Sequence, residues 1–353
     1  PMLVSFFIIA YNAEEKIKTV LQDLTEQDYP HEEIEIILVD SQSTDQTKQV
    51  MQAFQQEQTS FYRVLVLDNP KKILPAGWNV ALRECRGDVI VRVDAHCTIP
   101  SDFISANVKN FESGEKIVGG PRPSIIDAKS GWQRALLLAE TSLFGSGIAS
   151  YRHSEEKKYV STLAHGAYAR EVFETVGGYD ERLARTEDNE MHFRMREAGY
   201  KLLFDPAVHS SHHARNSFSR MAKQKYGNGY WIGITTAVSP RCFSLYHYVP
   251  AAFVLSLIIC AVAACLGFPW LLVALLGLYF AGAVGMTVLS ARGKVFTPFF
   301  LLLPALFFAL HTCYGWGTLV GFARLPFWKA KAENRGCPAK EEVRQALIRN
   351  HRK

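Results

Sequence analysis

Short apolar runs alternate with amphipathic segments through the N-terminal part of the chain. Each apolar run is rich in β-forming residues, and each amphipathic segment spaces its apolar residues three or four positions apart, as on one face of a helix. The pattern of a strand followed by a helix then repeats. The strands expected from this pattern cover residues 2–10, 34–39, 64–67 and 89–93. Such alternation, with nearly continuous apolar strands, predicts an α/β fold with a mostly parallel sheet flanked by helices.

Polar side chains follow three of these strands, at the point where each strand ends. Tyr11 follows the first strand, Asp40 the second and Asp94 the fourth. Parallel sheets bind ligands at the carboxyl ends of their strands, so this recurrence favours a ligand site, although Asp40 alone is more commonly a helix cap. Asp94 and His96 lie two residues apart. On an extended chain both point the same way and could bind one divalent cation.

Composition and missing motifs disfavour several other classes of protein. Neither G-x-G-x-x-G nor a P-loop follows the first strand, which disfavours a dinucleotide-binding dehydrogenase. The seven cysteines lack C-x-x-C spacing and are expected to be buried thiols rather than disulfides or a zinc site. The formal net charge is +5, and the basic residues after Phe322 suit a membrane surface better than a nucleic acid. No signal peptide precedes the first strand, so we expect a cytosolic N-terminal domain.

Three long apolar blocks dominate the C-terminal third of the chain. They cover residues 248–266, 270–289 and 296–322, each close to the ~20 residues that span a bilayer. The charged residues among them, Arg292 and Lys294, lie between blocks, so we expect membrane insertion. Three spans from a cytosolic domain would place the basic C-terminal residues outside, against the positive-inside tendency. A re-entrant or interfacial third block is therefore the alternative.

A second acidic centre lies in the later part of the N-terminal domain, where regular alternation fades. Residues 133–143 predict a helix, 145–147 a flexible loop and 201–204 a short strand. Glu187 and Asp188 stand in the first turn of a further predicted helix. Acids in that position usually serve as caps or oppose the helix dipole, and spacing alone leaves catalysis as the less common role.

The order of these features is more specific than any one of them. The segments that carry it are Tyr11-Asn12-Ala13-Glu14-Glu15, Val39-Asp40-Ser41-Gln42-Ser43-Thr44-Asp45, Asn69-Pro70, Asn79, Gly87-Asp88 and Asp94-Ala95-His96. Together they resemble the nucleotide-binding half of glycosyltransferase family 2. The Asp-Ala-His form, with Arg92 before it, is similar to the succinoglycan glucosyltransferase ExoA-like group. The resemblance implies a GT-A fold, a Rossmann-like sheet with flanking helices, that binds a nucleotide-sugar, usually a UDP-sugar, with a divalent cation.

The resemblance also implies a nucleotide-sugar-binding set by position. Its members are Tyr11 and Asp40 at the base, Glu14 near the nucleoside, Asn79, Lys72, and Asp94 at the diphosphate. Lys72, or Lys71, would substitute for an Arg that the family often carries where this chain has Trp78. His96 would join Asp94 on the metal, and a His in place of the second acid of D-x-D favours Mn²⁺ relative to Mg²⁺.

The same family places its general base at the second acid of a Glu-Asp pair, which implies that role for Asp188. In an inverting transfer this carboxylate takes the acceptor proton while the acceptor oxygen attacks opposite the diphosphate. Glu187 would orient the acceptor or the loop. Gly166 stands in a segment similar to the G-x-Y-x-R of the ExoA-like group. The resemblance implies that this glycine lets the donor sugar or the acceptor approach the backbone closely. The alternative is that Gly166 forms a tight turn.

Three further positions match the family downstream of these acids. His213 would be a further metal ligand and Arg215 a diphosphate contact, with a solvated histidine-rich loop at 205–215 as the alternative. Gln224 resembles a Gln of the ExoA-like group on the acceptor side. The Q-x-x-R-W motif of processive synthases does not occur in the sequence.

We therefore expect a membrane-anchored inverting glycosyltransferase that moves one sugar to a polyprenyl-linked saccharide in exopolysaccharide or surface-glycan synthesis. The alternatives are a processive polysaccharide synthase and a non-catalytic GT-A binding or scaffold subunit. The expected location is a bacterial-type cytoplasmic membrane, with the catalytic domain facing the cytosol. The expected partners are membrane lipid and other polysaccharide-assembly enzymes, and no nucleic acid is expected. The expected domains are a GT-A domain at 1–240 (halves 1–98 and 99–240), a membrane region at 241–325 with two or three apolar helices, and a basic tail at 326–353.

Overall fold

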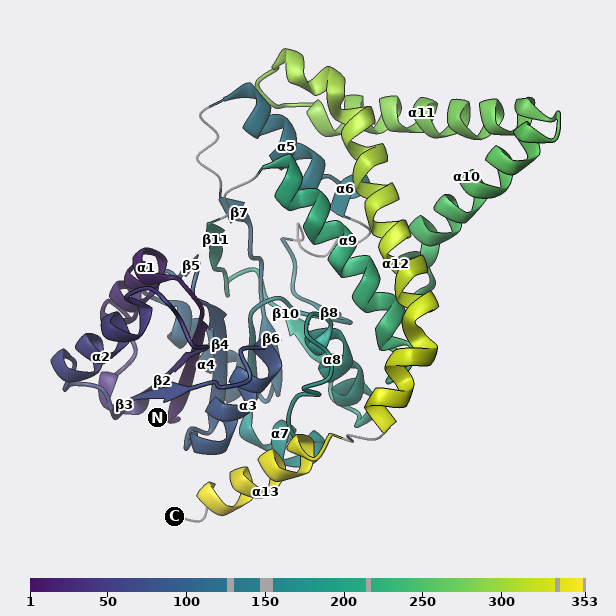
Figure 1. Cartoon of the computed structure of the whole chain (residues 1–353). Coiled ribbons are helices and arrows are strands. Elements are labelled where there is room, and N and C mark those ends of the chain that lie inside the picture. Colours follow the sequence, from purple (N-terminus) through teal and green to yellow (C-terminus); the bar gives the residue numbers. More distant parts are fainter. Residues whose placement is uncertain (126–129, 147–154, 214–216, 334–336, 352–353) are drawn as a thin grey trace. The chain divides into compact units, whose positions relative to one another are not determined.

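The computed structural model describes residues 1–125, 130–146, 155–213, 217–333 and 337–351 (Figure 1). The chain divides into two compact units. Unit 1 comprises 1–125, 151–214 and 336–353, and unit 2 comprises 126–150 and 215–335. Both units are therefore built from segments that are far apart in the sequence.

Unit 1 is organised around an eight-stranded sheet with the strand order β3-β2-β1-β4-β9-β6-β10-β8. Its strands are β1 (Val4–Ala10), β2 (Ile34–Asp40), β3 (Arg63–Asp68), β4 (Val89–Asp94), β6 (Ile117–Gly119), β8 (Lys158–Val160), β9 (Gly166–Ala169) and β10 (Leu202–Phe204). The first four strands are parallel, as predicted, because a helix between consecutive strands returns the chain to the same edge. β9 is antiparallel to both of its neighbours, and β8 is antiparallel to β10. The sheet is therefore mostly parallel but mixed.

Alternate residues of the central strands fill two separate cores, one on each face of the sheet. On β1, Phe6 and Ile8 belong to one core and Phe7 and Ile9 to the other. Every residue of β1 and β2 is buried, as expected for strands covered by helices on both faces. The helices of unit 1 are α1 (Glu14–Thr25), α2 (Thr47–Glu57), α3 (Leu74–Glu84), α4 (Phe103–Glu112), α7 (Arg170–Val176), α8 (Glu187–Glu197) and α13 (Ala339–His351), with a 3₁₀ turn η1 (His31–Glu33).

A second, small sheet includes the strand that follows β4 directly in the sequence. It has the order β5-β11-β7, with β5 (Cys97–Thr98), β7 (Ser124–Ile125) and β11 (Ser211–His213). The sequence predicted no strand at β11, for which a solvated histidine-rich loop was the alternative to a ligand site. The pairing of β11 with β5 depends on residues more than a hundred positions away. Such non-local pairing leaves no local pattern in the sequence.

Unit 2 is helical among the residues that the structure describes. Its elements are α5 (Gly131–Thr141), α6 (Leu143–Ser146), α9 (Phe218–Thr235), η3 (Leu245–Tyr248), α10 (Val249–Cys265), α11 (Pro269–Ala291), η4 (Pro298–Leu302) and α12 (Leu303–Glu333). Three apolar helical stretches are long enough to cross a membrane: Leu245–Cys265, Pro269–Ala291 and Pro298–Trp328. They correspond to the three predicted blocks.

The loop predicted at 145–147 is helical where the structure describes it, since Gly145 and Ser146 form the end of α6. Gly147 lies outside the described residues. A Cβ at Gly145 would collide with the backbone oxygen of Ala139. The glycine therefore permits close packing of α6 on α5 rather than flexibility.

The unit boundaries differ from the expected domains in two places. Residues 126–150 and 215–240 belong to unit 2 rather than to the sheet-containing unit. The basic segment 326–353 is divided, since α12 continues to Glu333 and α13 belongs to unit 1. Val343 and Leu347 of α13 are fully buried in the same core as Phe173. The apolar face of this last helix explains the difference, because it completes the core instead of remaining in solvent.

Truncation of the α13 core contact tests whether this helix belongs to the folded unit. Leu347→Ala removes a fully buried side chain and should lower the free energy of unfolding by about 2–5 kcal/mol, measured by denaturant titration in detergent. The control is Arg349→Ala, an exposed position on the same helix, which should change it by less than about 0.5 kcal/mol. Equal small effects of both substitutions would contradict the packing.

Candidate active site

The carboxyl ends of three parallel strands lie at one edge of the sheet. Ala10 of β1 is in register with Asp40 of β2, and Ile9 is in register with Asp94 of β4. Tyr11, the residue after β1, is 54% exposed. The structure therefore brings Tyr11, Asp40 and Asp94 to the same rim, as the sequence pattern predicted.

Asp40 shapes the loop that follows β2. Its side chain is buried, and both carboxylate oxygens accept the backbone N–H of Ser43, at 3.3 and 3.2 Å. Gln42, between them, has a φ of 63°, a left-handed conformation that non-glycine residues rarely adopt. The carboxylate thus stabilises a strained loop at the rim, and strain of this kind concentrates at ligand sites.

Two more side chains tie the β1 loop to the β2 loop. Asn12, with a φ of 46°, accepts the backbone N–H of Thr44 through Oδ1 at 2.8 Å. Glu14 accepts the backbone N–H of Gln46 through Oε2 at 2.9 Å. Glu14 therefore binds the neighbouring loop. It would influence a bound nucleoside by fixing the position of that loop.

Asn79 does not lie where it could contact a nucleotide directly. The side chain is fully buried, its amide nitrogen donates to Tyr179 O (3.0 Å) and to Glu181 Oε1 (2.9 Å), and its oxygen accepts Tyr179 N–H (2.7 Å). These bonds hold the segment that precedes α8. The expected nucleotide contact is therefore corrected to a structural one, because burial and three protein hydrogen bonds exclude a ligand.

The two lysines expected to replace the missing arginine are exposed. Lys72 adopts a φ of 61° in the loop before α3, and Lys71 forms an ion pair with Glu181. Trp78, which stands at the family's Arg position, is 2% exposed. The Trp78 side chain is therefore packed in the protein interior. The ammonium group of Lys72 remains accessible.

Asp94 is held by two side chains at the end of β4. Its Oδ2 accepts from Arg122 Nη1 at 2.7 Å and lies 3.1 Å from His165 Nε2. His165 is buried, and its Nδ1 lies 2.7 Å from Ser210 Oγ. Neither Arg122 nor His165 was singled out from the sequence, because both contacts join residues that are distant in the chain.

These contacts set the protonation of both groups. Burial opposes ionisation of Asp94, but the hydrogen bond from His165 and the positive charges of Arg122 and Arg92 outweigh it and hold the pKa of Asp94 well below its usual range. Burial lowers the pKa of His165 and keeps its ring neutral at neutral pH, despite the attraction of Asp94. A neutral ring that donates from Nε2 to Asp94 accepts at Nδ1 from the hydroxyl of Ser210. Asp94 is thus a fixed carboxylate.

Two further histidines lie near Asp94. β11 pairs with β5 so that His212 is opposite Cys97, and the rings of His96 and His212 lie 6.3 Å apart between centroids. Among the described residues, neither buried Nδ1 has a hydrogen-bond partner. Burial lowers the pKa of His96, and it lowers the pKa of His212 to about 4. Both imidazoles are therefore neutral, the form that binds metal ions.

The donor set suits a divalent cation, although the described side chains do not enclose one. No three His, Cys, Asp or Glu side chains of the described residues converge as a metal site. Two unpartnered neutral imidazoles beside a carboxylate nevertheless offer mixed nitrogen and oxygen ligands. His212 is one of the three histidines of segment 205–215, among which the family match favoured His213 as a ligand. The side chain of His213, which was expected, lies outside the described residues.

A buried ion pair joins β4 to the start of α8. Arg92 is 5% exposed and pairs with Asp188, whose side chain is 29% exposed. The guanidinium also donates to the Tyr179 hydroxyl at 3.1 Å and lies 4.9 Å from the Trp78 ring centroid. Arg92 and Asp94 are alternate residues of one strand and share a face. The pair therefore brings Asp188 to the face of β4 that carries Asp94.

The two acids of α8 have different environments. Glu187 is 4% exposed, and its Oε2 has no hydrogen-bond partner in the part of the chain that the structure describes. Burial, together with the neighbouring charge of Asp188, raises the pKa of Glu187 well above its usual range. Glu187 therefore keeps its proton to higher pH than an ordinary glutamate, whereas the partly exposed Asp188 pairs with a cation. This difference supports the expected division of roles between them.

A polar chain lies behind α8. The hydroxyl of Tyr168 is 2.8 Å from His192 Nε2, and His192 Nδ1 is 3.0 Å from Thr162 Oγ1. Burial lowers the pKa of His192 well below its usual range. A Cβ at Gly166 would collide with the ring of Tyr168. Gly166 lies in β9 rather than in a tight turn, and the group that it admits in this structure is Tyr168.

The structure does not test the two remaining predicted residues. Gln224 is an exposed residue of α9, in unit 2. Arg215 lies outside the described residues. Their expected roles at the acceptor and the diphosphate stay predictions.

Comparisons with known proteins bear on the family and the fold of the chain. The model of the family described as glycosyl transferase family 2 matches residues 5–177. A Methanococcus voltae protein, a dolichyl N-acetyl-α-D-glucosaminyl phosphate 3-β-D-2,3-diacetamido-2,3-dideoxy-β-D-glucuronosyltransferase, is 24% identical over 91% of this chain and 97% of that protein. The succinoglycan biosynthesis protein ExoA of Rhizobium meliloti is 29% identical over 55% of this chain and 58% of that protein.

A solved structure shares the fold of this chain. It is the mannosyltransferase PcManGT from Pyrobaculum calidifontis in complex with GDP-Man and Mn²⁺. The TM-score is 0.56 at 17% sequence identity, and the alignment covers 89% of this chain and 87% of that one. The likeness shows a common fold.

The raised pKa of Glu187 predicts a pH-dependent stability. The carboxyl of Glu187 has a higher pKa in the folded state than in the unfolded chain. Above pH ~4.3 the unfolded chain therefore loses this proton first, and the free energy of unfolding falls by about 1.4 kcal/mol per pH unit until the folded pKa is reached. Glu187→Gln removes this loss, so the variant should gain stability over the wild type between pH 5 and 8. Thermal unfolding of the variant and the wild type at pH 5 and at pH 8 measures this gain in stability. Glu57→Gln, at an exposed position, is the control. A constant difference between variant and wild type would contradict the raised pKa of Glu187.

Proposed function

Residues 5–177 belong to glycosyl transferase family 2, and on that basis we propose that this glycosyltransferase moves a single sugar, with inversion, from a nucleotide-sugar to a lipid-linked saccharide. The proposed donor is a UDP-sugar. The proposed product belongs to an exopolysaccharide or another surface glycan.

The observation that carries this proposal is the ion pair between Arg92 and Asp188. It places a partly exposed carboxylate on the face of β4 that also carries Asp94. In the proposed reaction Asp188 takes the proton of an acceptor hydroxyl while that oxygen bonds to the anomeric carbon. The bond from that carbon to the diphosphate breaks on the opposite side. Glu187, which is buried and whose pKa is raised, orients the acceptor or the loop.

Asp94, His96 and His212 would hold the divalent cation. When bound, the cation would neutralise the negative charge that develops on the departing diphosphate. Arg122 and His165 keep Asp94 ionised for this purpose. The nitrogen ligands favour Mn²⁺ relative to Mg²⁺. Tyr11 is exposed at the same rim and would stack on the base, with Asp40 fixing the adjacent loop.

Two observations support a lipid-linked acceptor. Unit 2 carries three apolar helical stretches that could cross a membrane. The Methanococcus voltae relative is named for a dolichyl-phosphate-linked sugar acceptor, and ExoA is named for succinoglycan biosynthesis. We accordingly propose a location at the cytoplasmic membrane, with the catalytic unit facing the cytosol.

Removal of the proposed base tests the reaction. Asp188→Asn should lower the rate of sugar transfer to membrane lipid extracts about 10²–10⁴-fold while donor binding persists, because the change removes proton transfer but keeps the shape of the side chain. Asp102→Asn, an exposed acid before α4, is the control and should transfer sugar at the wild-type rate. Unchanged transfer by Asp188→Asn would reject the role of Asp188. Long polymer made from donor alone would instead indicate a processive synthase.

Donor binding should depend on the proposed ligands of the cation. UDP- and GDP-sugars screened with Mn²⁺ should raise the thermal midpoint, with about 2.7 kcal/mol of stabilisation at a hundredfold excess over Kd, and a chelator should abolish the shift. His96→Ala and His212→Ala should weaken it. His209→Ala, an exposed histidine of the same segment, is the matched control. An undiminished shift in His212→Ala would remove that residue from the site.

A further inference from the structure

We infer that the membrane anchor is a two-helix hairpin of α10 and α11, and that α12 stays on the side of the membrane that holds unit 1. This inference rests on the membrane attachment proposed above. It does not depend on the catalytic roles. The alternative that composition alone suggests is three crossings, one for each apolar stretch.

The first argument comes from the return of the chain to unit 1 after the apolar helices. Leu347 of α13 is fully buried in a core of unit 1, and its backbone oxygen accepts from Arg170 Nη2 at 2.7 Å. Lys340 forms an ion pair with the fully buried Asp180 at 2.7 Å. One folded core cannot be divided by a bilayer. Residues 215–335, which connect the two ends, therefore cross the membrane an even number of times, and three crossings are excluded.

The second argument shows which stretch does not cross. Residues 126–150 leave unit 1 and return to it, and they are too few to cross twice at ~20 residues each. They therefore stay on the side of unit 1. Within unit 2 their helices pack on the start of the third stretch, where Trp132 lies 5.9 Å from Phe299 between ring centroids. The ring of His311 in α12 lies 2.7 Å, through Nε2, from the backbone oxygen of Phe144 in α6.

Both ends of the third stretch are therefore tied to the side of unit 1. Its beginning contacts the short excursion at 126–150, and its end leads back to α13. A helix with both ends on one side does not cross.

The neighbour of α12 supports this placement. α9 and α12 run side by side (Figure 1), and a Cβ at Gly229 would collide with the backbone oxygen of Tyr314. α9 carries Arg220 and Lys223, both exposed. If α12 crossed the bilayer, α9 would follow it and place these charges in hydrocarbon, which is strongly unfavourable. At the membrane surface the charges remain in water.

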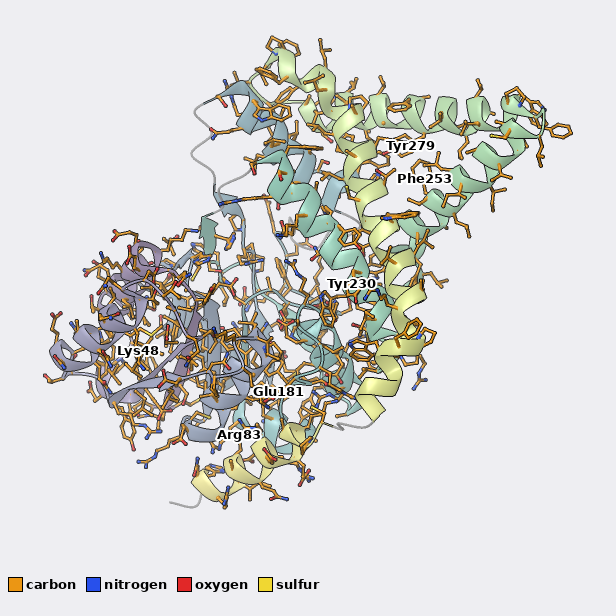
Figure 2. All side chains as sticks on the ribbon, viewed as in Figure 1. Lys48, Arg83, Glu181, Tyr230, Phe253 and Tyr279 are labelled. Carbon is orange, nitrogen blue, oxygen red and sulfur yellow. The ribbon has the colours of Figure 1, made fainter. Side chains whose placement is uncertain are left out.

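α10 and α11 have the opposite character. Only 11% and 6% of their apolar windows are buried within the protein, compared with 33% for the third stretch. The two helices form a hairpin joined by residues 266–268, and Phe253 stacks on Tyr279 with 4.7 Å between ring centroids (Figure 2). The hairpin turn carries no charge, whereas Arg292 and Lys294 follow α11. This distribution satisfies the positive-inside tendency if the side of unit 1 is the cytosol.

Labelling of single cysteines from each side of sealed membrane vesicles tests the inference. The full chain, with its seven native cysteines replaced, would carry Glu57→Cys in unit 1, Leu266→Cys in the hairpin turn or Val295→Cys before α12. All three positions are exposed. A membrane-impermeant maleimide should label Val295→Cys and Glu57→Cys from the same side and Leu266→Cys from the other side. Donor-induced thermal stabilisation serves as the check that each variant is folded.

Two outcomes would overturn the inference. Labelling of Val295→Cys only from the side opposite Glu57→Cys would show that α12 crosses. Failure to label Leu266→Cys from the opposite side would show that the hairpin does not cross. If the cysteine-free chain does not fold, an epitope tag after Lys353 of the unaltered chain distinguishes an even from an odd number of crossings. Its protease sensitivity should match that of unit 1, and protection would reject an even number of crossings.

Discussion

The ion pair between Arg92 and Asp188 is the interaction on which the rest of the proposed site depends. A guanidinium that is 5% exposed is costly unless a counter-ion accompanies it, so β4 and the start of α8 must meet. Asn79 holds the segment before α8 through the backbone of Tyr179, and Tyr179 in turn accepts a hydrogen bond from Arg92. The ion pair of Lys340 with Asp180 anchors the last helix to the same segment. Proposed catalysis and the fold of the C-terminus are therefore parts of one network.

Much of the fold could be predicted from local patterns in the sequence. The first four strands, their helices and the rim that carries Tyr11, Asp40 and Asp94 follow from the alternation of apolar runs and from polar strand ends. The antiparallel strand β9 and the small sheet could not be predicted, because both depend on pairing between distant residues. For the same reason no local pattern distinguished His212 from the other histidines of segment 205–215. Asn79 matched a family motif by position, but only its three hydrogen bonds reveal a structural role.

The C-terminal region shows how one packing contact changes the interpretation of composition. Hydropathy identified three apolar stretches, and basic residues after Phe322 suggested a tail at the membrane surface. The buried apolar face of α13 instead makes that segment a part of unit 1. With the proposed membrane attachment, an even number of crossings follows, and it would remove the conflict between a cytosolic location of unit 1 and the positive-inside tendency. A hairpin anchor would hold the proposed glycosyltransferase at a membrane without enclosing a polymer channel.

The anomeric configuration of the transferred sugar tests the central claim most directly. With Asp188 as the base opposite the departing diphosphate, transfer from an α-linked nucleotide-sugar should give a β-linked product. NMR of the product from an α-linked donor that the enzyme consumes distinguishes the two linkages by the one-bond coupling between C1 and H1. A β-linkage is the predicted result. An α-linkage would contradict attack from the side opposite the diphosphate, and with it the proposed role of Asp188.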